Sequence, residues 1–191
     1  MVQEVSESIA KVSNEKFENF IIENQFDIHD NNVLFCNFLD IVPNVAREYL
    51  PNANGDLKVN DFLAPSYLYG AGGLGLTLNS FIKWNNDLDK NILLSNELKS
   101  QMWSQFNYEV DDKLFGIGWE IYPIKESVSY GFAGGHVTHY IKYPDNNMSI
   151  IWLSSGYRFP FNTKIVVDYI AGLADDKIMI DKINNLQQEN N

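Results

Sequence analysis

The sequence has little cysteine, little basic charge and no long hydrophobic run. Cys36 is the only cysteine among 191 residues, which excludes an intrachain disulfide and a zinc site built from several cysteines. Fourteen Lys and Arg residues stand against 25 Asp and Glu residues, and the formal net charge is −11. Because nucleic acids and anionic membranes bind basic surfaces, we predict neither as a partner. No apolar run approaches the roughly 20 residues that cross a bilayer, so we predict no membrane segment in this chain.

The apolar content is nevertheless high enough for a folded core. Hydrophobic residues make up 45% of the chain and aromatic residues 14%, and the length fits a single domain over 1–191. Cys36 lies among Phe35, Phe38 and Leu39, so we expect it to be a small buried hydrophobic residue rather than a nucleophile. The acidic N-terminus does not look like a secretory signal. The compartment therefore stays open: cytoplasmic if the chain is complete, exported if a longer parent carries a signal.

Periodicity and turn residues divide this domain into helical and strand-rich parts. Apolar residues at helical spacing, interrupted near Ser13, predict two consecutive helices at the N-terminus. Strict alternation predicts a strand over 115–121, and Pro144 to Asn147 predict a turn between two antiparallel strands. The predicted segments are a helical part over 1–26, a loop-rich part over 27–78, a helical part over 79–105, an antiparallel sheet over 113–155 and a helix over 162–174.

The same periodicity predicts which helix faces point inward. The helix that follows a cap at Thr77 or Asn79 is expected to bury Phe81, Ile82, Trp84 and Leu88. The helix over 162–174 is expected to bury Ile165, Val166, Tyr169, Ile170 and Leu173.

Two patterns that often mark cofactor or metal sites lack the context that such sites need. Gly70 to Gly75 match the letters of a dinucleotide-binding loop, but no β-α-β pattern surrounds them. His136 and His139 are three residues apart in a predicted strand, where odd separations point to opposite faces, and neither they nor His29 have an obvious further ligand. We therefore predict a structural glycine turn, ordinary surface or hydrogen-bonded histidines, no metal and no cofactor.

Three serines stand three residues before a lysine, a spacing that places both side chains on one helical turn. In penicillin-recognising enzymes such a lysine takes the proton of the nucleophilic serine. A pattern with two fixed letters also arises by chance, so each serine has the alternative role of a cap or an exposed helix residue. The pairs are Ser8 with Lys11, Ser13 with Lys16 and Ser80 with Lys83.

Several segments, each weak alone, match one pattern in order and spacing from about residue 5 to residue 173. Ala71 to Trp84 read AGGLGLTLNSFIKW, Phe115 to Glu120 read FGIGWE, and Gly131 to Gly135 read GFAGG. They resemble the AGGL-x-ST-x-x-D-L-x-x-W segment, the (Y/F)GLGW strand and the G-H-(T/S)-G-G strand of class C β-lactamase-like and penicillin-binding-protein-like serine hydrolases. The remaining matching segments are Val12–Ile21, Ile41–Tyr49, Tyr140–Asp145 and Ser149–Gly156.

The resemblance implies an α+β fold, the C-terminal part of a β-lactamase/transpeptidase-like fold with an antiparallel sheet flanked by helices. In the family, the nucleophilic Ser-x-x-Lys and a Tyr-x-Asn element precede the helix that Val12–Ile21 resembles. Ser8 and Ser13 therefore stand in the wrong place for that nucleophile, Ser80 lies in a different helix, and the sequence contains no Tyr-x-Asn. We expect a truncated gene or one piece of a split protein.

The family's third motif, Lys or His followed by Thr or Ser and then Gly, is altered here. Phe132, Ala133 and Gly134 stand in its place, without the cation and the hydroxyl that bind a substrate carboxylate. Gly135 falls where the family takes one oxyanion-hole N–H, while the second N–H belongs to the missing serine. The resemblance therefore implies no complete catalytic set in this chain.

Two functions from different classes stay open. In the first, the chain is part of a serine hydrolase completed by an N-terminal half, with Tyr67 and Tyr69 as wall residues on the side of a small ester, amide or β-lactam substrate. In the second, it is a catalytically dead relative kept as a binding or scaffold module. The parent fold has an N-terminal strand and helix, and without them a strand edge and an apolar sheet face are exposed. We therefore expect self-association or a partner such as the missing half.

Overall fold

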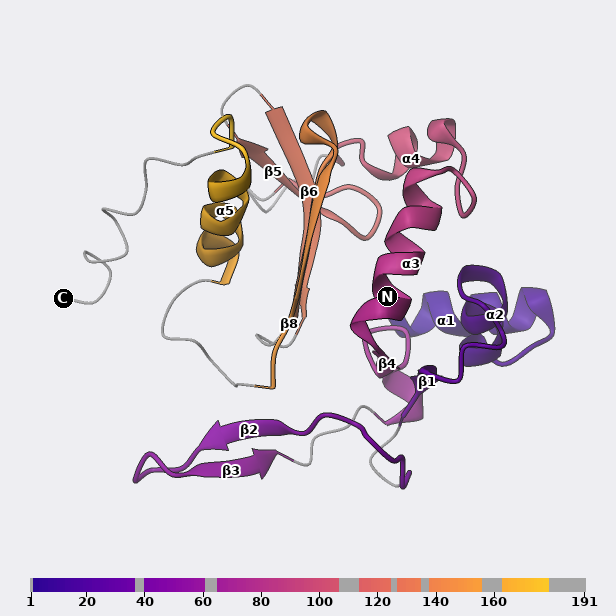
Figure 1. The fold of residues 1–191 in the computed structure, drawn as a ribbon. Coiled ribbons are helices and arrows are strands. Elements are labelled where there is room, and N and C mark those ends of the chain that lie inside the picture. The colour runs from indigo at the N-terminus through magenta and orange to yellow at the C-terminus, as the bar shows by residue number, and fades with distance from the viewer. Residues whose placement is uncertain are drawn as a thin grey trace. The chain divides into compact units, whose positions relative to one another are not determined.

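The computed structural model describes residues 2–36, 40–60, 65–106, 114–124, 127–134, 138–155 and 163–178. The contacts within the chain divide it into two compact units, Met1–Ser95 and Asn96–Asn191. Helices and antiparallel strands occur in both units, as expected for an α+β chain (Figure 1). Each unit is described by itself.

The first unit begins with two short helices, α1 (Val2–Ser13) and α2 (Phe17–Gln25). Between them Asn14 takes the left-handed conformation, with φ 58°, which asparagine tolerates better than most residues. The chain therefore turns at this point, and the predicted break near Ser13 is confirmed.

Two small antiparallel pairs follow. β1 (Val33–Phe35) pairs with β4 (Leu74–Leu76). The segment between these two strands contains a hairpin of β2 (Glu48–Pro51) and β3 (Leu57–Asn60). A short 3₁₀ helix, η1 (Ser66–Leu68), stands before β4. The stretch predicted as loop-rich thus carries short strands, and Gly73 with φ 100° supports the prediction of a structural glycine turn.

α3 (Leu78–Asp89) ends the first unit. The predicted cap is confirmed, because the Thr77 hydroxyl oxygen accepts from the Ser80 N–H at 3.2 Å. Leu88 is fully buried as predicted, but Ile82 is exposed. The buried face includes Ser80 instead, because its hydroxyl donates to Asp30 Oδ2 at 2.6 Å. A long-range hydrogen bond thus turns a polar residue inward.

The second unit begins with α4 (Asn96–Met102), and the strand predicted over 115–121 is wrong in its first part. Phe115 makes only isolated bridges, and the regular strand begins after Trp119. In between, the Gly116 N–H donates to the Trp119 carbonyl at 2.8 Å, and Gly118 has φ 74°. The alternating glycines therefore form a tight turn, since the left-handed region favours glycine.

Four antiparallel strands then form one sheet in the order β5-β6-β7-β8. Their bounds are Glu120–Ile124, Ser127–Gly134, Thr138–Tyr143 and Met148–Leu153. The turn between β7 and β8 is the 3₁₀ helix η2 (Pro144–Asn146) followed by Asn147 at φ 49°. The hairpin predicted from Pro144 to Asn147 is confirmed.

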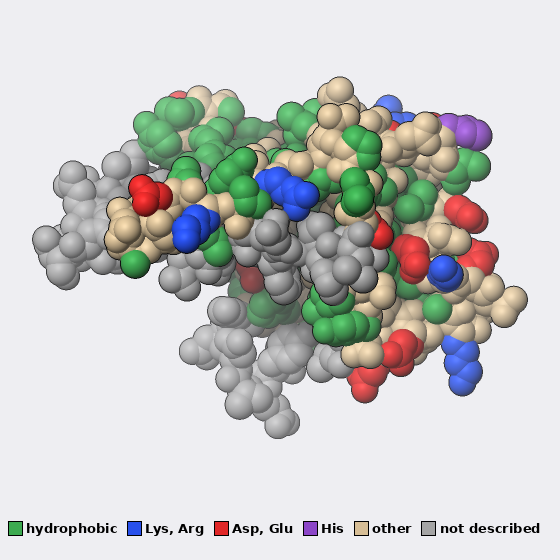
Figure 2. All heavy atoms as spheres, turned by 90° about the horizontal axis from the view of Figure 1, so that it is seen from below, with side chains coloured by type: hydrophobic (Ala, Val, Ile, Leu, Met, Phe, Trp, Pro, Cys, Tyr) green, Lys and Arg blue, Asp and Glu red, His purple; other side chains and the backbone are tan. Residues whose placement is uncertain are grey.

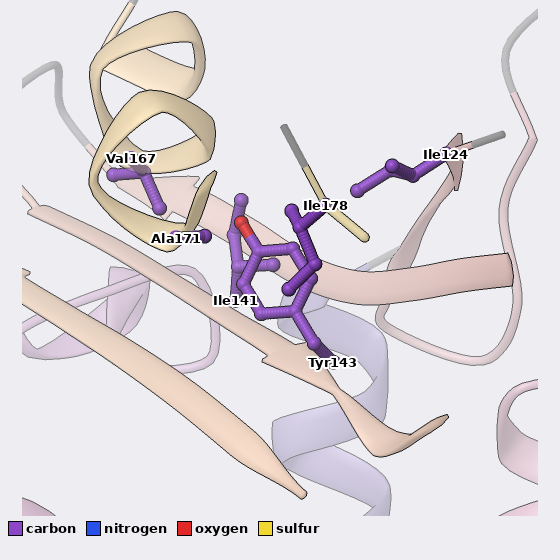
Figure 3. Close-up of a cluster of buried hydrophobic side chains, with 6 residues drawn as sticks. All are labelled: Ile124, Ile141, Tyr143, Val167, Ala171 and Ile178. Atoms are coloured by element: carbon purple, nitrogen blue, oxygen red, sulfur yellow. The ribbon is translucent and has the colours of Figure 1, made fainter. Parts of the chain in front are cut away.

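The core of the second unit lies between one face of this sheet and α5 (Thr163–Ala174). Figure 3 shows Ile141 and Tyr143 of β7 facing Val167 and Ala171 of α5. Ile124 and Ile178 complete the cluster.

The predicted inward face of α5 is wrong. Its most deeply buried residues include Val167, Asp168 and Ala171, whereas Tyr169 and Leu173 are exposed. α5 is apolar on several sides, so periodicity alone does not select one face. The structure turns Asp168 inward, where its carboxylate accepts a hydrogen bond from the buried Tyr143 hydroxyl at 2.9 Å.

Gly131 of β6 lies where the chain needs a glycine. A Cβ built at this position would come within 2.1 Å of the Tyr140 carbonyl oxygen and 2.9 Å of the Ile141 side chain. The contact with the Tyr140 oxygen is far shorter than a carbon atom tolerates, so the pairing of β6 with β7 depends on the bare backbone at Gly131.

Within the described residues, no helix is long and apolar enough to cross a membrane. Figure 2 shows one face of the molecule, on which acidic and basic side chains lie in separate small groups among hydrophobic ones.

Candidate functional site

The first unit contains an open cavity of about 760 Å³ that brings Tyr67 and Tyr69 together. This volume lies within the range of roughly 300–1,000 Å³ typical of small-molecule sites. The two tyrosines proposed from the sequence as wall residues are therefore both cavity residues. The other lining residues are Lys16, Glu18, Asn19, Ile22, Leu34, Phe35, Asp40 and Ser66.

Three segments that are distant in sequence form this cavity. The start of α2 contributes Glu18 and Ile22, which are four residues apart and share one helix face. β1 contributes Phe35, and η1 and the residue after it contribute Tyr67 and Tyr69. The rings of Phe35 and Tyr69 are 4.9 Å apart between centroids, which makes a packed aromatic wall.

The altered third motif lies at the end of β6 in the second unit. Phe132 is 53% exposed, while Ala133 and Gly134 are half-buried. The Thr138 hydroxyl donates to the Gly134 carbonyl at 3.0 Å, which ties this end of β6 to β7. Gly135, the candidate for an oxyanion-hole N–H, lies outside the described residues. Phe132 thus presents an exposed apolar ring at this end of β6.

A row of polar residues crosses the same sheet face as Phe132. The strand register places Tyr130 opposite Lys142, and Lys142 opposite Ser149. Lys142 is only 3% exposed, and its Nζ donates to Ser149 Oγ at 3.0 Å. Burial, and then Asp145, raise the pKa of Tyr130. Sequence reasoning did not single out Lys142; its alternation with Tyr140 was the available signal.

The opposite sheet face carries a second buried polar group. Tyr143 and Lys164 both hydrogen-bond to the Asp168 carboxylate. His139 shares this face of β7 and is 2% exposed. Burial, followed by the positive charge of Lys164, lowers the pKa of His139. His139 is therefore not a surface histidine, the first of the two roles predicted for it. His136 lies outside the described residues.

The three serines of the Ser-x-x-Lys pairs bond to other groups. Ser8 and Ser13 each donate to the backbone carbonyl four residues earlier, at 2.7 and 2.8 Å. The Ser80 hydroxyl donates to the Asp30 carboxylate, and this hydrogen bond is the largest cause that lowers the pKa of Asp30. These contacts match the alternative role of helix residues.

Cys36 is buried as expected, and burial, followed by the charge of Asp40, raises the pKa of its thiol. A thiol held in its protonated form is a poor nucleophile. Among the residues that the structure describes, no group of three or more His, Cys, Asp or Glu side chains could hold a metal ion.

No family model matches the sequence, and no curated protein matches it. Solved structures do match. The penicillin-binding protein from Bacillus halodurans superposes with a TM-score of 0.70 and 19% identity, over 85% of this chain and 52% of that one. The octameric penicillin-binding protein homologue from Pyrococcus abyssi gives 0.69 and 17%, over 88% and 40%. This chain has the penicillin-binding-protein fold.

The same β-lactamase/transpeptidase-like fold extends to enzymes with other names. A D-amino acid amidase from Ochrobactrum anthropi, solved with D-phenylalanine, matches with a TM-score of 0.59 at 16% identity, over 79% of this chain and 48% of that one. Simvastatin synthase from Aspergillus terreus matches with a TM-score of 0.64. The chain therefore spans about half the length of the solved structures that share its fold.

Proposed function

We propose that this chain is the C-terminal part of a β-lactamase-related serine hydrolase, inactive alone and completed by a second half that carries the nucleophile. The observation that carries the proposal is the coverage of the fold match, which takes in 85% of this chain but only 52% of the Bacillus halodurans protein. The positions of the serines support it. Ser8, Ser13 and Ser80 bond to a carbonyl or a carboxylate, so the proposal assigns the nucleophile to the other half.

The chemistry in the completed protein is acyl transfer. A serine from the complementary half attacks the carbonyl carbon of an ester, amide or β-lactam and forms an acyl-enzyme. An ester or amide releases its alcohol or amine, whereas a β-lactam ring opens and keeps its amine attached. Water then hydrolyses the acyl-enzyme and frees the acid. This chain contributes the end of β6, and Gly135, the next residue in sequence, is the candidate for an oxyanion-hole N–H donor. Because Phe132 and Ala133 offer neither a cation nor a hydroxyl, we expect substrates without a carboxylate at this position.

The partner in this proposal is the complementary half, with self-association as the alternative. Within the described residues, β8 pairs only with β7, so its other edge has no strand partner there. Leu153 at the end of β8 is exposed. Open strand edges readily accept another strand, which supports a role for β8 in assembly.

A fluorophosphonate probe tests this proposal, because it labels activated serines covalently. We expect no label on the purified chain. When the tagged chain is isolated under native conditions from its own cells, we expect label on a co-purifying polypeptide. Label on any serine of this chain alone, located by mass spectrometry, would overturn the proposal. A compact monomer in sedimentation that co-purifies with no other polypeptide would contradict the partner as well.

The alternative function is a catalytically inactive binding or scaffold module. The exposed ring of Phe132 favours it, because an apolar side chain replaces the group that would bind the substrate carboxylate. The two functions differ in one result. A scaffold co-purifies with partners of which none reacts with the probe, whereas the split hydrolase brings down a labelled serine.

A further inference from the structure

We propose that the cavity of the first unit binds a small organic ammonium ion that carries an aromatic or apolar group. This inference concerns residues 1–95 and holds whether or not the chain takes part in acyl transfer. It rests on the lining of the cavity, on the burial of its charged groups and on the charge of the chain.

Aromatic rings dominate the apolar part of the lining. Phe35, Tyr67 and Tyr69 come from two segments and face one cavity, together with the aliphatic Ile22 and Leu34. The faces of aromatic rings attract cations through their quadrupole, and several rings around one cavity form the common recognition site for alkylated ammonium groups. Tyr67 is 64% exposed, so its ring is accessible to a ligand without any rearrangement of the core.

The charged lining residues favour a cation over an anion. Two carboxylates, Glu18 and Asp40, line the cavity with a single ammonium, Lys16. Glu18 is half-buried, whereas Lys16 and Asp40 are exposed. Because water screens an exposed charge more strongly than a partly buried one, Glu18 sets the sign of the local potential.

The charge of the whole chain acts in the same direction. A formal net charge of −11 attracts cations and repels anions at long range. The polar groups of Asn19 and Ser66 also line the cavity and offer acceptors to the N–H groups of an ammonium ion. A phenyl ring on a short alkylammonium would therefore place its ring against Phe35 and Tyr67 and its charge near Glu18.

Phenethylammonium is the probe for this site, with phenylpropionate and phenethyl alcohol as matched anionic and neutral compounds. Calorimetry or ligand-observed NMR on the full chain should show saturable binding of the cation, weaker binding of the alcohol and the weakest binding of the carboxylate. Preference for the carboxylate, or no saturable binding of the cation, would overturn the proposal.

Three substitutions locate the binding. Tyr67→Ala and Glu18→Gln should each raise the Kd of the cation by about two- to fivefold, as expected for one exposed ring or one partly exposed charge. Lys16→Gln should lower the Kd, because it removes a like charge from the lining. An effect of the opposite sign at Lys16 would mean that the site recognises an anionic group, and it would overturn the proposal.

Matched controls come from the same unit. Tyr49→Ala removes a tyrosine of β2 that does not line the cavity, and Glu15→Gln removes an exposed carboxylate one residue before Lys16. Both should leave the Kd unchanged, and circular dichroism should show that all variants are folded. If Tyr67→Ala and Glu18→Gln behave like these controls, the cation binds elsewhere on the acidic surface and the proposal fails. Neither outcome changes the result expected with the fluorophosphonate probe.

Discussion

The two units of this chain are stabilised in different ways. Residues 96–191 contain one four-stranded sheet whose neighbouring strands are also neighbours in sequence, with a core that α5 covers. Residues 1–95 contain two separate two-stranded sheets, and polar hydrogen bonds such as Ser80 to Asp30 and Trp84 to Gln25 connect distant segments. The second unit therefore has an apolar cluster between one sheet and one helix, whereas the first unit connects separate strand pairs and helices through individual contacts between distant segments.

Ile141→Ala should have the largest effect and should act on the second unit. Ile141 is fully buried in the cluster between β7 and α5. Losing its side chain leaves a cavity, and such changes cost about 2–5 kcal/mol of the free energy of unfolding. Urea denaturation measures the loss, and hydrogen exchange should show faster exchange in residues 96–191. Equal loss of protection in both units would contradict the distinction between them.

Tyr143→Phe should cost less, about 1–3 kcal/mol, because it leaves a buried carboxylate without one of its donors. The Tyr143 hydroxyl donates to Asp168 at 2.9 Å, and the pKa of the hydroxyl is strongly raised, first by burial. Tyr49→Phe is the matched control, because the ring of Tyr49 is exposed. Thermal unfolding of both variants checks the difference; a Tyr143→Phe protein as stable as the control would show that this hydrogen bond adds nothing.

Ser80→Ala tests the polar contacts of the first unit and should cost about 1 kcal/mol near neutral pH. The pKa of Asp30 lies below its ordinary value of 3.8, with the Ser80 hydrogen bond as the first cause. The stabilisation from ionised Asp30 is therefore complete above 3.8 and is lost as the pH falls through the lowered pKa. The difference between variant and parent in urea denaturation should shrink in that acid range. A difference that grows on acidification would contradict this account.

His139 should make the second unit sensitive to mild acid while having no effect above neutral pH. Its pKa is lowered from the ordinary 6.5, mainly by burial. The unfolded chain therefore takes up a proton at a higher pH than the folded chain, and stability falls as the pH drops below 6.5 towards the lowered pKa. His139→Gln should remove this part of the pH dependence. An unchanged slope between neutral pH and pH 5 would show that other groups cause it.

Local sequence signals predicted the elements that depend on nearby residues. The break near Ser13, the cap at Thr77 and the turn from Pro144 to Asn147 each follow from the backbone preferences of a few adjacent residues. The resemblance of scattered segments added the fold, which the solved structures share. These predictions needed no knowledge of which strand pairs with which.

The strand predicted over 115–121 failed at a local turn around Gly118, whereas the other errors concern contacts between distant residues. Nothing near Ser80 indicates that Asp30 turns it inward, and nothing near Asp168 indicates that Tyr143 does the same for α5. The pairing of β1 with β4 was not predicted either, because a whole hairpin separates the two strands in sequence. Of the residues that line the cavity, Tyr67 and Tyr69 carried a prediction from the sequence, whereas Glu18 and Phe35 join them only through the tertiary fold.

Two adjacent residues of β6, Gly131 and Phe132, differ in how much change they tolerate. A methyl group at Gly131 would collide with the next strand, so a side chain there should disrupt the pairing of β6 with β7. The neighbouring Phe132 is exposed, so its replacement should change the surface and leave the pairing intact. The chemistry of this surface can therefore change at one position while the adjacent position preserves the pairing of the strands.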